Sequence, residues 1–156
     1  MDFNIGCLRG LKDRELSTLC VIMLTDFIYK EKYMALENLT AQNFEEKVSS
    51  SDIVILDFWA PWCGPCKQFG PIFEKVAEEY PDILFGKVNT EEEQAIAGHF
   101  QIQSIPTVVI LRENIALFQQ PGMLPEEALH DLIKQVKALD MDQIRKEIAQ
   151  QQNAGQ

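Results

Sequence analysis

Cysteine is scarce in this chain of 156 residues, which contains only four. Four cysteines are too few for the disulfide-rich scaffold of a small secreted protein. A chain of this length, with 46% hydrophobic residues, can bury a core large enough to fold without such cross-links. We therefore expect one domain with extensions, in which cysteine serves chemistry more than structure.

Positive charge is also scarce. The chain has 14 Lys and Arg residues against 24 Asp and Glu residues, which gives a net charge of −10 and a pI of about 4.6. Proteins that bind a phosphate backbone carry clusters of basic residues, and no such cluster occurs here. This composition argues against a nucleic-acid partner, and we expect the negative charge to serve solubility.

Long hydrophobic runs are absent from the N-terminal region. The apolar run at 16–24 has about half the length that a membrane span requires. It is also a poor export signal, because Asp13 and Glu15 interrupt the basic residues before it and no small-residue cleavage site follows. We expect no membrane association and a cytoplasmic location.

From Met34 onward the apolar residues alternate between strand and helix periodicity. The patterns predict strands at 53–60, 83–89, 107–112 and 116–120, and helices at 41–49, with Thr40 as N-cap, 63–80, 91–100 and 125–139. The first two strands enclose a helix in a βαβ unit and should be parallel, whereas the last two should form an antiparallel hairpin. The predicted fold class is α/β, with a central mixed β-sheet flanked by helices on both faces.

The ends of the chain do not share this pattern. We predict an N-terminal extension of unknown role at 1–33, a folded domain at 34–140 and a polar C-terminal tail at 141–156, which we expect to be a frayed helix. Since Met34 stands where the pattern begins, one hypothesis is that translation starts there. Peptides from the first 33 residues in the native protein would contradict it.

The most informative stretch is WAPWCGPCKQF, residues 59–69, in which two residues separate Cys63 from Cys66. The pair follows a predicted buried strand and opens a predicted helix. Unpaired backbone N–H groups and the helix dipole at that position favour a thiolate, which is the attacking species in disulfide exchange. Cys66 lies one turn further in and can close a ring with Cys63. Pro65 is harmless in the first helical turn.

Two other interpretations of the cysteine pair are a zinc site and an inert buried pair. Zinc takes four ligands in structural sites, but twelve residues separate Cys7 from Cys20, instead of the short spacing of a zinc knuckle. His99 and His130 lie on predicted helices elsewhere. The flanking tryptophans, glycine and proline argue against an inert pair. We expect no metal, and we expect Cys7 and Cys20 to act as ordinary apolar residues.

FWAPWCGPCKQF at 58–69 resembles the active-site stretch of thioredoxins, and SIPT at 104–107 resembles the cis-proline loop of that family. The resemblance covers about 34–140. It implies a thioredoxin fold and a protein-disulfide reductase that works through a mixed disulfide. In that chemistry Cys63 would be the nucleophile and Cys66 would resolve the mixed disulfide.

The resemblance also implies roles for other residues. Asp57 would be a buried carboxylate that moves protons to or from Cys66, and its desolvation should raise its pKa. Lys87 would face Asp57, and Pro106 would form a cis peptide bond opposite the cysteines. The substrate-binding surface would comprise Trp59, Trp62, Gly64, Pro65, Ile105 and Gly122. Asn114 departs from the family, which usually has glycine at this turn, but asparagine tolerates positive φ.

For partners and cofactors, the resemblance implies disulfide-containing protein substrates and electrons from NADPH through thioredoxin reductase, with no cofactor bound to this chain. We expect a monomer. Two alternatives remain open. An oxidase or isomerase of the same fold typically carries histidine between the cysteines, where this chain has Gly64 and Pro65. A non-catalytic docking or chaperone-like subunit would keep its biological activity after Cys63→Ser.

Overall fold

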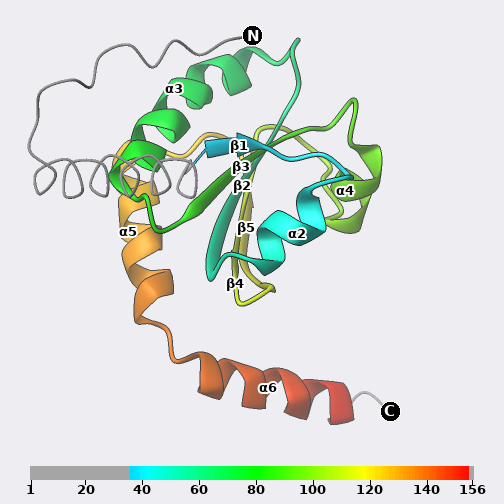
Figure 1. Ribbon diagram of the computed structural model, residues 1–156, viewed down its shortest axis with the longest axis vertical. Coiled ribbons are helices and arrows are strands. Elements are labelled where there is room, and N and C mark those ends of the chain that lie inside the picture. Colours follow the sequence, from blue (N-terminus) through cyan, green and yellow to red (C-terminus); the bar gives the residue numbers. More distant parts are fainter. Residues whose placement is uncertain (1–35, 155–156) are drawn as a thin grey trace, which may run out of the picture. The chain divides into compact units, whose positions relative to one another are not determined.

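The computed structural model describes residues 36–154 (Figure 1). In this range the secondary-structure elements follow in the order β1 (Leu36–Asn38), α2 (Phe44–Ser49), β2 (Ile53–Trp59), α3 (Gly64–Glu79), β3 (Leu84–Asn89), α4 (Gln94–His99), β4 (Thr107–Arg112), β5 (Ile115–Pro121), α5 (Glu126–Ala138) and α6 (Met141–Ala154). None of the helices described is long and apolar enough to cross a membrane.

The five strands form one mixed sheet in the order β1-β3-β2-β4-β5. Strands β1 and β2 both run parallel to β3, while β4 runs antiparallel to β2 and to β5. The parallel βαβ unit and the antiparallel hairpin are therefore confirmed. Strand β2 lies at the centre, which explains why its sequence reads as a nearly continuous buried run.

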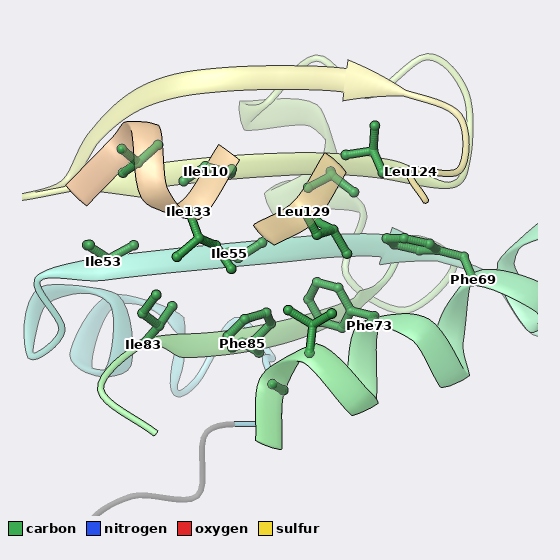
Figure 2. Packing of buried hydrophobic residues seen from close by; sticks show 14 residues of the cluster. Ile53, Ile55, Phe69, Phe73, Ile83, Phe85, Ile110, Leu124, Leu129 and Ile133 are labelled. Carbon is green, nitrogen blue, oxygen red and sulfur yellow. The ribbon is translucent and has the colours of Figure 1, made fainter. Parts of the chain in front are cut away.

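Helices cover both faces of the sheet, as predicted. Side chains alternate between the two faces along β2, so that Ile53 and Ile55 face one core and Val54 and Leu56 face the other. The first core contains most of the buried residues of α3 and those of α5 (Figure 2), and the second contains Val48 of α2 and Ile96 of α4. This alternation turns the next odd-numbered residue of β2, Asp57, toward the face that α3 covers.

Two helices begin three residues later than predicted. Helix α2 begins at Phe44 with Asn43 as N-cap, so the predicted cap at Thr40 is wrong. The Thr40 N–H donates to Asn43 Oδ1 at 2.8 Å, and residues 41–43 form a turn. Helix α4 begins at Gln94 because Asn89 Oδ1 accepts the Glu91 N–H and holds the preceding acidic residues in a turn.

The sequence patterns missed strand β1, which has only three residues and is too short to show an alternation. It pairs with β3 in register from Leu36 opposite Phe85 to Asn38 opposite Lys87. The chain then packs Leu39 against Gly86, where a Cβ atom would lie 2.3 Å from a methyl carbon of Leu39. Glycine is needed at this position for close packing.

The turn between β4 and β5 consists of Glu113 and Asn114, which have φ angles of 51° and 63°. Positive φ at both central residues is typical of a type I′ hairpin turn, in which asparagine and glycine are preferred. Asn114 thus occupies the left-handed region without a glycine, as its tolerance of positive φ predicts.

Helix α6 continues to Ala154, and its start is held by local contacts. The Asp140 carboxylate accepts the N–H groups of Asp142 and Gln143, and Met141 is buried. The side chain of Arg145 pairs with Glu113 of the β4–β5 turn. The predictions for residues 1–33, for Cys7 and Cys20, and for a start at Met34 lie outside the described residues.

Candidate active site

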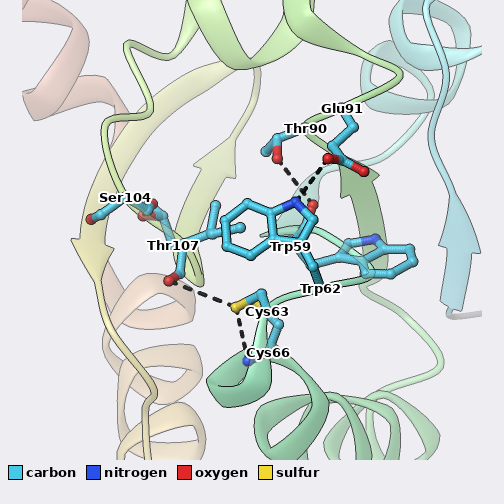
Figure 3. Close-up of a disulfide and its surroundings, with 9 residues drawn as sticks. Trp59, Trp62, Cys63, Cys66, Thr90, Glu91, Ser104 and Thr107 are labelled. Atoms are coloured by element: carbon cyan, nitrogen blue, oxygen red, sulfur yellow. Dashed lines mark hydrogen bonds between the residues drawn. A yellow bond between two sulfur atoms is a disulfide. The ribbon is translucent and has the colours of Figure 1, made fainter.

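The two cysteines lie at the first turn of α3, directly after the central strand β2. Cys63 is the N-cap of the helix, and its Sγ accepts the N–H of Cys66 at 3.2 Å (Figure 3). A disulfide joins the two residues, and both are buried. Gly64 and Pro65 are exposed between them. The helix N-terminus therefore directs an N–H group at the Cys63 sulfur, which stabilises negative charge there when the disulfide is reduced.

The loop before β4 lies against the first cysteine. The Ile105–Pro106 peptide bond is cis, and the Ile105 carbonyl oxygen is 3.9 Å from Cys63 Sγ. The Gly122 N–H donates to the Pro106 carbonyl at 2.7 Å, which joins this loop to the end of β5. Gly122 has a φ angle of 96°, a conformation that other residues rarely adopt. The cis-proline loop thus lies beside Cys63 and is joined to the residue after β5.

Asp57 lies behind the second cysteine and is fully buried. Neither of its carboxylate oxygens has a hydrogen-bond partner in the part of the chain that the structure describes. Burial raises the pKa of Asp57 from 3.8 to about 7, with Lys87 lowering it and Glu74 raising it further. A carboxyl group with a pKa near 7 can both accept and donate a proton at neutral pH.

Asp57 opens onto a cavity of about 210 Å³, lined by Asp57, Trp59, Cys66, Lys67, Gly70, Pro71, Glu74 and Lys87. Cys66 and Asp57 therefore lie on the walls of the same cavity. Lys87 is the register partner of Asp57 on β3, and it lines the same cavity. The structure therefore brings together the three residues of the predicted proton-transfer group.

Glu74 also lines this cavity, although the sequence patterns did not single it out. Its Oε1 accepts the Lys87 ammonium at 3.0 Å. A signal was present, because Cys66, Gly70 and Glu74 are spaced four residues apart and fall on one stripe of α3. If Cys66 faces Asp57, the same spacing predicts that Gly70 and Glu74 lie on the side of the helix that faces the aspartate.

The two tryptophans have different environments. The Trp62 side chain is 68% exposed, and its Nε1–H donates to Glu91 Oε1 at 2.8 Å. Trp59 instead lines the Asp57 cavity, with its ring centroid 5.5 Å from Lys87 Nζ. The structure therefore places Trp59 on the cavity that Asp57 and Lys87 line, although the sequence suggested that both tryptophans flank the substrate surface.

An open groove runs beside Trp62. It has a volume of about 560 Å³ and is lined by Trp62, Thr90, Gln94, Ala97, Gly98, Ile102, Gln103, Ser104 and Ile105. It lies next to Cys63, since Ile105 contributes to the groove and contacts the sulfur.

Potential metal ligands gather elsewhere. In residues 36–154, one group of three side chains could hold an ion. It consists of Glu79, Glu126 and His130 and includes neither cysteine. The Glu126 carboxylate is already bound by Lys75 through both oxygens, at 2.7 and 2.9 Å. The described residues therefore offer the cysteine pair no histidine or carboxylate cluster of the kind that zinc requires.

Comparisons with known proteins agree with this geometry. The thioredoxin family profile matches residues 35–135. A Streptomyces coelicolor protein named "Putative thioredoxin 2" is 56% identical over 114 residues, covering 73% of this chain and 85% of its own length. Thioredoxin of Bacillus subtilis is 39% identical over 101 residues, which cover 64% of this chain and 96% of the Bacillus protein. The structure of a mutant thioredoxin from Halobacterium salinarum superimposes with a TM-score of 0.62 at 31% identity. The match covers 67% of this chain and 93% of the Halobacterium chain.

The residues matched by the family profile include the segments that carry the cysteine pair, the buried aspartate and the cis-proline loop. The five-stranded mixed sheet with flanking helices is the thioredoxin fold. The chain therefore belongs to the thioredoxin family, as a dithiol–disulfide reductase whose redox-active pair is Cys63 and Cys66.

Proposed function

We propose that the reductase works by two successive thiol–disulfide exchanges with distinct roles for the two cysteines. The Cys63 thiolate attacks one sulfur of a substrate disulfide, and the other substrate sulfur leaves as a thiolate. Cys66 then attacks Cys63 Sγ in the mixed disulfide. The second substrate thiolate leaves, and the Cys63–Cys66 disulfide forms. Two electrons pass from the cysteine pair to the substrate. The position of Cys63 at the N-terminus of α3 is the observation that carries this assignment.

In the second exchange, Cys66 must lose its proton before it attacks. We assign Asp57 as the base that accepts this proton, because the two residues line one cavity and no other described group bonds to the carboxylate. The proton is returned when the disulfide is reduced again. Because burial raises the pKa of Asp57 to about 7, its carboxyl group can accept the Cys66 proton in one step and return it in the other near neutral pH.

The substrate-binding surface that we propose consists of Trp62, Gly64, Pro65, Ile105 and Gly122, with the groove beside Trp62. An extended substrate segment pairs with the backbone at Ile105, in the manner of an added β-strand. The support for this pairing is the Ile105 carbonyl oxygen, which lies 3.9 Å from Cys63 Sγ and so places this backbone beside the nucleophile. Trp59 supports the site from the cavity side.

The oxidised pair must be reduced for the next cycle. We propose that NADPH supplies the electrons through a thioredoxin reductase, that disulfide-containing proteins are the substrates, and that the cycle operates in the cytoplasm. The support is the membership of the family and the Gly64–Pro65 dipeptide between the cysteines. For the domain organisation, we propose that the catalytic unit is residues 34–140, and that the flanking segments are not needed for exchange.

Reduction of insulin disulfides by the full chain tests the function. With dithiothreitol as donor, the wild type should accelerate insulin precipitation and Cys63→Ser should not. With NADPH and a bacterial thioredoxin reductase as donor, NADPH oxidation should depend on the chain. Acceleration by Cys63→Ser at the wild-type rate would contradict the assigned nucleophile. No NADPH oxidation, despite activity with dithiothreitol, would contradict only the proposed electron donor.

A further inference from the structure

The Lys87 ammonium bonds to Glu74 and not to Asp57. Its Nζ is 3.0 Å from Glu74 Oε1, whereas both Asp57 oxygens lack a hydrogen-bond partner among the described residues. The three side chains become more exposed in a fixed order. Asp57 is fully buried, Lys87 is 18% exposed and Glu74 is 50% exposed. Glu74 therefore holds the ammonium toward the solvent end of the cavity.

Two further neighbours describe where the Lys87 ammonium lies. Its Nζ lies 5.5 Å from the centroid of the Trp59 ring, within the range of a cation–π interaction. It also passes over Gly70, where a Cβ atom would lie 3.6 Å from Nζ. Glu74 is the only one of these three neighbours that carries a charge, so it supplies the strongest directional contact.

The position of the ammonium matters because Asp57 has few other charged neighbours. Helix α3 contributes Cys66, Lys67 and Glu74 to the cavity, and β3 contributes Lys87. On the other side of β2, the register partner of Asp57 on β4 is the apolar Val108. An ammonium brought against the buried carboxylate would favour its ionised form and weaken it as a base.

We propose that Glu74 is a positioning residue of the exchange reaction, which holds the Lys87 ammonium away from Asp57 and thereby keeps Asp57 able to take up the Cys66 proton near neutral pH. This inference rests on the role proposed above for Asp57. Loss of the Glu74 charge releases Lys87 to turn toward the carboxylate. It also removes a nearby negative charge, and both changes favour ionised Asp57.

The test measures the titration midpoint of the Asp57 carboxyl by ¹³C NMR in the oxidised full chain. The Glu74→Gln variant should lower this midpoint by about half a pH unit or more. Glu78→Gln is the matched control, because this substitution removes the same charge from an exposed acid one turn further along the same helix. Its midpoint should remain at the wild-type value. A Glu74→Gln midpoint that equals the control, or rises, overturns the proposal.

A second comparison separates positioning from a direct electrostatic effect. In a Lys87→Met background there is no ammonium to release, so Glu74→Gln should shift the midpoint by less than half as much. An equal shift in both backgrounds shows that Glu74 acts on Asp57 without Lys87, which overturns the positioning role. Because NMR reads the midpoint without turnover, the result stands apart from the insulin assay. A wild-type midpoint near the ordinary value for aspartate would contradict the role of Asp57 itself.

Discussion

The two sulfurs of the active site lie between regions of opposite character. On the docking side, beside Cys63, are the exposed Trp62 and the Ile105 carbonyl, with an open groove of about 560 Å³. On the proton side, beside Cys66, a cavity of about 210 Å³ holds a buried carboxylate and a lysine. Two cysteines of one helical turn can therefore have different roles in the exchange reaction, because their surroundings differ.

The largest effect is expected from exchanging the two cysteines for serine one at a time. Cys63→Ser removes the nucleophile on the docking side, and insulin reduction should fall to the uncatalysed rate. Cys66→Ser keeps the nucleophile but cannot resolve the intermediate, so a covalent complex with substrate should accumulate. Mass spectrometry after reaction with a disulfide peptide distinguishes the two. Equal accumulation by both variants would contradict the division of roles.

Asp57→Asn tests the proton side through stability. Burial raises the pKa of Asp57 from 3.8 to about 7, so the folded state binds a proton more tightly than the unfolded state. Stability therefore falls as pH rises through this window, and the ionised carboxylate destabilises the fold most above pH 7. The gain in unfolding free energy from Asp57→Asn should grow by about 2–3 kcal/mol between pH 5 and pH 8.

Denaturant unfolding of the oxidised wild type and variant at both pH values measures this gain. Glu92→Gln is a suitable control, because Glu92 is an exposed acid in the turn before α4. Its effect on the unfolding free energy should stay within about 0.5 kcal/mol at either pH. A gain from Asp57→Asn that does not depend on pH would show that burial does not perturb this carboxyl group.

Trp62→Ala tests the docking side without the proton side. The Trp62 side chain is mostly exposed, so its loss should change the unfolding free energy by no more than about 0.5 kcal/mol. An exposed aromatic beside a groove is typical of a binding hot spot, and kcat/KM for insulin should fall about 10-fold. The pH profile should not move. A displaced pH profile would mean that the two sides are coupled through the cysteines.

The smallest effect is expected at the β4–β5 turn, which belongs to neither side. Asn114→Gly places the residue that a type I′ turn prefers at a φ angle of 63°. The unfolding free energy should rise by no more than about 1 kcal/mol, with the insulin activity unchanged. Thermal unfolding and the insulin assay measure both. A change in activity would show that a change in stability far from the cysteines alters turnover, so that activity does not depend on the docking and proton sides alone.

Much of the sheet could be predicted from the sequence, because its strands are buried runs and its longer helices are amphipathic. Strands β2, β3, β4 and β5 and helices α3 and α5 fall close to their predicted positions. The starts of α2 and α4 were wrong, since side-chain contacts of Asn43 and Asn89 hold the preceding residues in turns. Strand β1 was missed because three residues carry no periodic signal.

The sequence by itself determined the local chemistry of the site. It placed Cys63 and Cys66 in one helical turn after a buried strand, and it placed Asp57 within that strand, because spacing and periodicity are properties of neighbouring residues. Only the tertiary structure decided that Glu74 binds Lys87, that Trp59 joins the cavity while Trp62 faces the groove, and that Gly122 meets Pro106. These contacts join separate elements, and local patterns do not encode the distances across a fold on which electrostatic effects depend.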